Sequence, residues 1–481
     1  MPTEVMSSAQ AVQEDDDTPD LAKANEIPFN YEMRIETDTL RPVVFTDDFM
    51  RFTLQKKGFL SHQSKLQIQL GTVPTGVAKT GNFFPPLNIG INSVIDRAVL
   101  KVGNRTLCET QEFARLQGYR SVFLTPENNR EREYYLTARC ISYQPEYSAG
   151  DVASKVSSTF AIDTGRNAKV AVNGIGGVDY SLLPCSIVDD AKDEDFSSYS
   201  IYLGDLFDIF NGNNLPLYLI EDQVHIEIST NDAKSVRMCN DSAAQLDAEF
   251  PLDKDNGKNV LVYDTIYYDG ETMEKYRRGK GSDLQFGYVD YRCTRRTGTA
   301  AQFATGFDQN IGGAGRMVDR VICALENTTF GAGTQPEELL TNQFYSQGPN
   351  QPARKLKTNI RYNDRDKYAT DLDNLSVIFR ETGRAEGLGS EPHVPKAYYS
   401  PFQVPSISVA GIQGNNQSVS FARRFCYNAF KIDRGERVNN QGITLTYTSD
   451  ITGEEDSTLF VWTALKKIAT IKNGYMDSYF V

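Results

Sequence analysis

The sequence has few of the residues from which metal sites, disulfide frameworks and sugar-stacking surfaces are built. Its 481 residues include three histidines, one tryptophan and seven cysteines. The cysteines are odd in number, lie at least 30 residues apart and form no C-x-x-C pair, standing at positions 108, 140, 185, 239, 293, 323 and 426. We therefore expect neither a disulfide framework nor a structural zinc site, and instead buried thiols in a reducing compartment.

Long apolar segments are also missing. No run of 18 or more apolar residues occurs, and the first residues lack the basic and apolar regions of a signal peptide. We expect neither a transmembrane segment nor conventional secretion.

Basic residues are the minority charge, with 50 Lys and Arg against 63 Asp and Glu and a net charge of -13. The basic clusters are pairs such as Arg295-Arg296, and phosphate binding normally requires a basic surface. Direct, sequence-specific nucleic-acid binding is therefore not expected. The 25 Tyr, 26 Phe and 40% hydrophobic residues exclude disorder for most of the chain, and the length suits two to four domains.

Motifs of catalysis are absent from the sequence, which has no G-x-S-x-G, H-E-x-x-H, P-loop or EF-hand pattern. Residues 279–282, Gly-Lys-Gly-Ser, resemble a phosphate loop superficially, but Glu274 replaces its first glycine. His62, His225 and His393 lie far apart, and His225 falls on the polar side of an alternating segment. We predict no catalytic, cofactor-binding or metal-binding residue, no cofactor and no enzymatic activity.

The hydrophobic pattern is that of an all-β protein with many short strands. Leu66, Ile68 and Leu70 alternate with polar residues, and residues 224–228 and 443–447 do the same. Four dipeptides favour hairpins or tight loops, at positions 103–104, 173–174, 269–270 and 473–474. Helical spacing is scarce, and it predicts short inserted helices at residues 112–123 and 203–210.

An internal duplication sets the expected domain organisation. SVIDRAVLKVGN, from Ser93, aligns with RMVDRVICALEN, from Arg316, and places Asp96 opposite Asp319. VHIEISTN, from Val224, aligns with ITLTYTSD, from Ile443. The two offsets, 223 and 219 residues, nearly agree and indicate two similar all-β domains. We predict an acidic N-terminal arm at 1–34, a first domain at 35–235, a linker at 236–258 and a second domain at 259–481.

Two stretches carry a resemblance to a known family. Leu203-Gly-Asp-Leu-Phe-Asp-Ile-Phe, followed by Leu215-Pro-Leu and the strand at 224–228, resembles the end of the first barrel in double jelly-roll major capsid proteins. The stretch from Leu459 to Tyr475, with Asn473-Gly474, is similar to their final strand and terminal hairpin. The likeness is to proteins of small eukaryotic double-stranded DNA viruses, of the polinton-like virus and virophage type.

The resemblance implies two tandem eight-stranded jelly rolls and a shell protein that assembles as a pseudo-hexameric homotrimer, the capsomer, tiling an icosahedral shell around double-stranded DNA. It implies a location in the virion and partners that include other copies of the chain, neighbouring capsomers, a penton protein and minor or cement proteins. Loops at 127–132, 151–179 and 381–394 would reach outward or contact neighbours.

Two other interpretations remain open from the residues. Two β-sandwich domains could bind or cleave carbohydrate, since grooves lined by Asp, Glu and Tyr would serve such chemistry. The single tryptophan, Trp462, and the missing signal peptide weigh against this alternative. A viral fibre or attachment protein is a third interpretation, but the repeats of triple-stranded fibres are absent.

Overall fold

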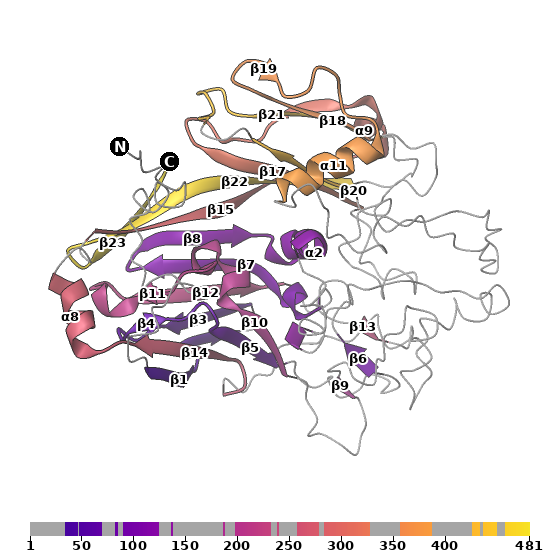
Figure 1. Cartoon of the computed structure of the whole chain (residues 1–481). Helices are drawn as coiled ribbons and strands as arrows, with labels where there is room; N and C mark the ends of the chain where they lie inside the picture. Colours follow the sequence, from indigo (N-terminus) through magenta and orange to yellow (C-terminus); the bar gives the residue numbers. More distant parts are fainter. Residues whose placement is uncertain are drawn as a thin grey trace, which may run out of the picture.

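The structure, a computed structural model, is built mostly of β-strands with a few short helices (Figure 1). It describes residues 34–46, 48–69, 82–84, 90–124, 136–137, 186–187, 198–231, 238–239, 257–278, 283–327, 356–386, 426–432, 436–449 and 457–481. Residues 1–33, 127–132, 151–179 and 279–282, His393 and most of the expected linker lie outside the described residues. The acidic arm and two of the three expected outward loops are therefore not described here.

The second half of the chain forms a jelly roll of eight strands. They are β15 Asp283–Gly298, β16 Phe307–Asn310, β17 Val318–Asn327, β18 Leu356–Tyr362, β19 Arg365–Asp366, β20 Cys426–Lys431, β21 Thr444–Ser449 and β22 Ser457–Lys472. One row of strands runs β15-β22-β17-β20 and the other runs β16-β21-β18-β19. Apart from the hairpin β18-β19, which lies in one layer, consecutive strands thus alternate between two layers, as in a jelly roll.

The first half is also a two-layered β structure. One layer runs β2-β3-β12-β7-β8, and the other runs β10-β5-β14-β4-β11 with β1 beside β14. The strands are β1 Arg34–Leu40, β2 Val44–Thr46, β3 Phe49–Thr53, β4 Phe59–Leu60, β5 Lys65–Gln69, β7 Ile95–Val102, β8 Arg105–Gln111, β10 Ser198–Tyr202, β11 Leu215–Pro216, β12 Val224–Thr230 and β14 Val260–Tyr267. A small separate sheet joins β6 Asn82–Phe84, β9 Ser186–Ile187 and β13 Met238–Cys239.

Strand β14 corrects the expected start of the second domain at residue 259. It pairs with β1, β4 and β5 of the first half and lies at the bottom of Figure 1 among them. Leu261, Tyr263 and Ile266 are buried in the first core. The hydrophobic pattern of a strand shows only that the strand has a buried face, not which core buries it.

The first of the two repeat alignments is confirmed by strand pairing. β7 begins one residue before Asp96, and β17 begins one residue before Asp319. In both strands the register shifts at that aspartate, so that neither Asp96 nor Asp319 has a partner residue in the ladder. Equivalent β-bulges at aligned positions are a feature of equivalent strands.

The second repeat alignment is wrong. β12, at residues 224–230, pairs with β7, whereas β21, at residues 444–449, lies in the opposite layer beside β18. β12 pairs with β7 in the first half. The corresponding partner of β17 in the second half is β22. Ser229 stands opposite Arg97, and Ala464 stands opposite Arg320. Both β12 and β21 bury alternate residues, so alternation alone did not distinguish the two layers.

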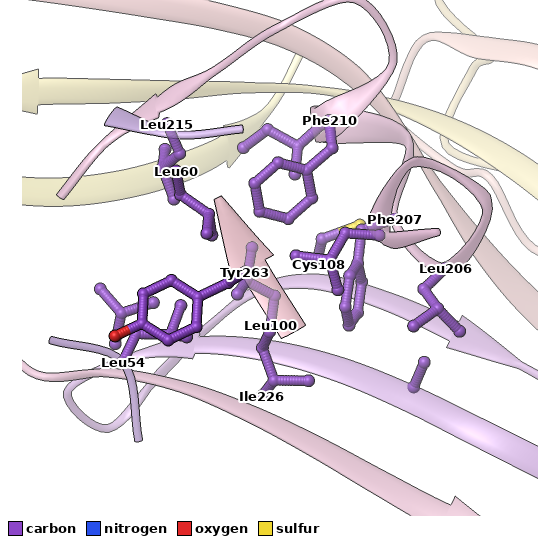
Figure 2. Close-up of a cluster of buried hydrophobic side chains, with 14 of the residues drawn as sticks. Leu54, Leu60, Leu100, Cys108, Leu206, Phe207, Phe210, Leu215, Ile226 and Tyr263 are labelled. Atoms are coloured by element: carbon purple, nitrogen blue, oxygen red, sulfur yellow. The ribbon is translucent and has the colours of Figure 1, made fainter. Parts of the chain in front are cut away.

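Two hydrophobic cores lie between the layers. The first includes Phe207, Phe210 and Tyr263, and Figure 2 shows these rings with Cys108 among the aliphatic side chains. It also takes in Phe286 of β15 and Ile471 of β22, so the long strands of the second half reach across the first barrel. The second core is lined by residues such as Val321 and Tyr447.

Both expected helical segments and the turns at 103–104 and 473–474 are confirmed, and the turn at 173–174 lies outside the described residues. α2 spans Phe113–Leu124, and the second expected helix is α6 Leu203–Leu206 followed by the 3-10 turn η5 Asp208–Phe210. Two other 3-10 segments among the described residues are η2 Gly90–Val94 and η6 Leu217–Leu219. Asn473 and Gly474, both at positive φ, close the hairpin from β22 to β23 Tyr475–Phe480.

Three helices were not expected, namely α8 Gly270–Arg278, α9 Ala300–Thr305 and α11 Leu375–Ala385. Asp269-Gly270 closes no hairpin, because the Asp269 side chain accepts a hydrogen bond from the Thr272 N–H and caps α8. Thr299 forms a capping box with Gln302 at the start of α9. The first five residues of the expected loop at 381–394 belong to α11.

Candidate functional site

The two halves meet where β8 of the first barrel lies parallel to β15 of the second. Thr110 stands opposite Tyr291, and the sheet continues through this contact as β7-β8-β15-β22-β17. We call β8, β15, β22 and helix α2 at this junction the seam. Buried charged side chains gather on both faces of the sheet here, and the seam is therefore the candidate functional site.

On one face of the seam, Glu109 of β8 is held between two arginines. Its Oε1 lies 2.7 Å from Nε of Arg97, and its Oε2 is paired with Arg292 of β15. Burial of Glu109 favours protonation, but the hydrogen bond from Gln111 and the charges of Arg292 and Arg97 outweigh it and lower its pKa. The carboxylate is therefore ionised and cross-links the two halves.

Asp290 of β15 lies beside this pair and is fully buried. Its Oδ1 accepts a hydrogen bond of 2.7 Å from the Glu109 N–H, and its Oδ2 lies 3.1 Å from Arg292. Burial raises the pKa of Asp290 against the opposing charges of Lys467 and Arg292. The backbone of one half is thus fixed by a side chain of the other.

Lys467 of β22 completes this cluster although only 4% of it is exposed. Its Nζ donates to the Leu107 carbonyl at 2.9 Å and lies 3.5 Å from Oδ2 of Asp290. The Tyr288 hydroxyl donates to the same Leu107 carbonyl. A buried ammonium needs such partners, because an unpaired charge in the interior is strongly destabilising.

On the opposite face, helix α2 binds the second half. Arg120 of α2 and Arg320 of β17 both donate to Oε2 of Glu386, at 3.1 and 3.0 Å. The Arg120 guanidinium also stacks over the Tyr291 ring. Burial raises the pKa of Tyr291 to about 12, against the lowering effect of Arg120 and Arg320. Glu386 thus lies between one arginine from each half.

At the start of α2, Glu112 pairs with Arg115 of the same helix and with Arg295 of β15. Both arginines also lie over the Phe460 ring of β22, at 4.7 and 5.6 Å from its centroid. Cation–π contacts add to the ion pairs at this site. Of the Arg295-Arg296 pair noted in the sequence, Arg295 contacts the seam with 58% of its side chain exposed, and Arg296 lies over the Phe307 ring of β16.

Gln111 joins the two halves through both backbone and side chain. Its carbonyl accepts a hydrogen bond from Nε1 of Trp462 at 3.0 Å, and its Oε1 accepts one from the Cys293 N–H at 3.0 Å. Trp462 is fully buried. The tryptophan therefore has no free face on which a sugar ring could stack.

The chemistry of the seam is structural. The described carboxylates of the seam are bound by arginine, lysine or backbone N–H groups. No group of three His, Cys, Asp or Glu side chains in the described part of the chain is arranged to hold a metal ion. The arrangement fixes the relative position of the two barrels.

The two described histidines lie apart from the seam. His225 is on β12, where Nδ1 is 3.0 Å from Oγ1 of Thr53, and burial with the nearby Arg51 charge lowers its pKa. His62 contacts Oδ1 of Asn214. The seam was not predicted from the sequence. The sequence features that belong to it are a basic pair, to which no role was assigned, and the single tryptophan.

Among the described residues, large apolar side chains are exposed on three elements, the β2 edge, β1 and β23. Val43 and Val44, at the β2 edge, are 68% and 40% exposed, and Ile35 lies on the edge strand β1. Tyr475 and Tyr479 are exposed on β23. Exposed apolar side chains beside an open strand edge favour association.

Comparison with known proteins establishes the fold. No protein-family model matches the chain, and neither does any curated protein sequence. Among solved structures, VP54 of the virus PBCV-1, fitted into a reconstruction of the virophage Sputnik, matches with a TM-score of 0.53, 12% identity and coverage of 95% of this chain and 98% of VP54.

A structure of the Sputnik virophage matches with a TM-score of 0.53 and 9% identity, covering 94% of this chain and 90% of the other. The major capsid protein of mavirus matches with a TM-score of 0.50 and 9% identity, covering 100% and 96%. The chain therefore has the double jelly-roll fold of these viral proteins, as its sequence predicted. None of the described helices is long and apolar enough to span a bilayer.

Proposed function

We propose that the chain is a viral major capsid protein, located in the virion, which assembles as a pseudo-hexameric homotrimer and tiles an icosahedral shell around a double-stranded DNA genome. The observation that carries the proposal is the double jelly-roll fold, shared over at least 94% of the chain with the viral structures of PBCV-1, Sputnik and mavirus. Two similar barrels per chain give three chains a sixfold-like outline.

The seam supports a structural role. A building block of a shell needs a fixed angle between its two barrels, and buried ion pairs between the halves, such as Arg120 with Glu386, supply that rigidity. Such pairs hold a geometry well because losing one partner leaves a buried charge alone. We propose that the chain has no catalytic, cofactor-binding or metal-binding residue and is not an enzyme.

The carbohydrate alternative loses support. Its most suitable stacking residue, Trp462, is buried in the seam, and the buried carboxylates there are ion-paired. Neither arrangement suits a sugar-binding groove, which needs exposed aromatic rings and accessible acids.

The proposed partners are other copies of the chain, neighbouring capsomers, a penton protein and minor or cement proteins. With a net charge of -13 the shell would not bind DNA tightly, so other proteins or counterions would neutralise the genome. We propose a division into an arm at 1–34, a first barrel formed by 35–235 together with β14, a linker at 236–258, and a second barrel formed by the rest of 259–481.

The proposal is tested with the full-length recombinant chain by size-exclusion chromatography with light scattering and by negative-stain microscopy. We expect a particle of three times 53.8 kDa with a hexagonal outline. A monomer at all concentrations that binds or cleaves polysaccharide would overturn the proposal.

A further inference from the structure

Lys467 of β22 and Asp290 of β15 form an ion pair that is almost completely out of water. Their side chains keep 4% and 0% of their surface exposed, and Nζ of the lysine lies 3.5 Å from Oδ2 of the aspartate. Other described lysines that pair with a carboxylate keep at least 30% of the side chain exposed, namely Lys57, Lys101, Lys431 and Lys466. An amine and a carboxyl group that are held in contact inside a protein can react with each other, because they no longer have to meet by diffusion.

The strand register holds the two groups against each other. Lys467 stands opposite Tyr288, and Asp290 stands opposite Leu465, so the two residues are diagonal neighbours on antiparallel strands. Diagonal neighbours lie on the same face of a sheet and within reach of a long side chain. The approach of the amine to the carboxyl group is therefore set by backbone pairing.

Both oxygens of the Asp290 carboxyl group have donors that polarise the group. Oδ1 accepts a hydrogen bond of 2.7 Å from the Glu109 N–H, and Oδ2 lies 3.1 Å from Nη2 of Arg292. A backbone N–H in this position stabilises the negative charge that develops on an oxygen when its carbon is attacked. Burial raises the pKa of Asp290 despite the charges of Lys467 and Arg292, so the neutral acid forms more readily here than on a surface.

The amine of Lys467 is held by protein groups on its other sides. Nζ donates to the Leu107 carbonyl at 2.9 Å, and it lies 4.8 and 5.9 Å from the centroids of the Phe480 and Tyr288 rings. Bulk water opposes the condensation of an amine with a carboxyl group, because water is a product of the reaction. A site that orients both groups and excludes water favours it instead, and this pair meets both conditions.

We propose that Lys467 and Asp290 condense after folding to form an amide cross-link between β22 and β15. The ammonium first transfers a proton from Nζ to Oδ2, and the free amine then attacks Cγ. The Glu109 N–H stabilises the charge that develops on Oδ1. Oδ2 takes a second proton from Nζ and leaves as water, so a C–N bond replaces a C–O bond. An ammonium and a carboxylate thus become one amide and one water molecule, and no oxidant or other reactant is needed.

A second pair of a lysine and an aspartate differs in the conditions that matter. Nζ of Lys431 lies closer to its carboxylate, 2.8 Å from Oδ1 of Asp319, but one-third of the lysine side chain is exposed. Burial of Asp319 favours protonation, but the charge of Arg320 and the hydrogen bond from Lys431 outweigh it and lower its pKa. This carboxylate stays ionised beside a solvated amine, so we expect the pair to remain an ion pair.

The cross-link goes beyond the proposed capsid function and does not depend on it, since both residues belong to one chain. Each chain would react once with itself, so the chain would still not be an enzyme. The bond would close a loop from residue 290 to residue 467 and fix β22 to β15 beside the Leu107 carbonyl of the first barrel.

Mass spectrometry of the full-length chain, purified folded and then denatured, tests the inference. We expect an intact mass that is lower than the sequence mass by one water molecule. Trypsin should release a branched peptide that joins residues 281–292 to residues 467–472, because it does not cleave after an acylated lysine. Fragmentation of this peptide should place the link at Asp290 and Lys467.

Lys467→Arg is the test variant, since it keeps the positive charge while a guanidinium does not condense with a carboxyl group. We expect its intact mass to equal its own sequence mass. Lys431→Arg is the matched control and should still lose one water molecule. Far-UV circular dichroism checks that both variants are folded.

A folded, unsubstituted chain with the full sequence mass and no branched peptide would overturn the inference, whether or not that chain forms capsomers. A loss of water that persists in Lys467→Arg, or that maps to another pair of residues, would overturn it as well. If Lys467→Arg does not fold, the branched peptide of the unsubstituted chain decides the question alone.

Discussion

Arg120 and Glu386 are 266 positions apart in the chain, yet Nε of the arginine lies 3.1 Å from Oε2 of the glutamate, whose side chain is fully buried. Arg320 donates to the same oxygen. The carboxylate therefore joins α2 of the first half to β17 of the second and neutralises part of the charge of two guanidinium groups that are largely out of water.

Replacing Glu386 by Gln should destabilise the protein strongly. The two arginines would remain buried without an anionic partner, and breaking a buried ion pair on one side costs about 3 to 5 kcal/mol. Urea unfolding followed by circular dichroism measures the change. Asp366→Asn is the matched control, because the pair of Arg361 and Asp366 is more than half exposed and should contribute at most about 1 kcal/mol. Equal effects of the two substitutions would contradict the role of Glu386.

Acid should weaken the seam through Glu109. Its pKa is lowered in the folded state from 4.5, so the unfolded chain binds a proton more readily. Its contribution to the free energy of unfolding is then complete above pH 4.5 and is lost as the pH falls below that value through the folded pKa. Urea titrations at intervals between pH 6 and pH 3 should show a shallower decline for Glu109→Gln than for the unsubstituted chain. Parallel curves would mean that Glu109 is not stabilised as an anion.

Replacing Trp462 by Phe should cost about 1 to 3 kcal/mol, since the buried Gln111 carbonyl would lose its donor and the smaller ring would leave space. Circular dichroism is the appropriate measurement, because Trp462 is the single tryptophan and its fluorescence would be lost. In the unsubstituted chain the same fluorescence should resist acrylamide quenching until the protein unfolds. Strong quenching of the native protein would contradict the burial of this ring.

The strand content and the two-barrel architecture could be predicted from the sequence because they depend on local patterns. The alternation at 65–69 and 224–230, the helical spacing at 113–124 and the Asn473-Gly474 turn each act within one element. The aligned Asp96 and Asp319 also carried real information, because a bulge is fixed by neighbouring residues on one strand.

What the sequence did not reveal depends on contacts between distant segments. β14 has the pattern of any half-buried strand, and only its pairing with β1 and β5 assigns it to the first barrel. The seam was missed for the same reason, since Glu109 and Arg292 are 183 positions apart and each resembles an ordinary surface charge. The helix α8 was detectable, because Asp269 three residues before Thr272 is a capping arrangement that was interpreted as a turn.

The thiols of Cys108 and Cys323 test whether the seam makes the two barrels one cooperative unit. Both are fully buried, Cys108 in the first core (Figure 2) and Cys323 in the second, and burial raises the pKa of each thiol well above its usual range. Neither should react with iodoacetamide in the folded protein, because the thiolate is the reacting form.

Reaction then requires opening of the structure, and its rate reports the stability of the unit that opens. If the ion pairs of the seam couple the barrels, peptides containing Cys108 and Cys323 should become alkylated together as urea is raised below the unfolding midpoint, as quantified by mass spectrometry. In the Glu386→Gln variant the coupling between the barrels is weakened, and the two thiols should be alkylated at different rates. If the two thiols are alkylated at different rates in the unsubstituted chain, the barrels open independently. The seam would then fix the position of the barrels without making them unfold as one unit.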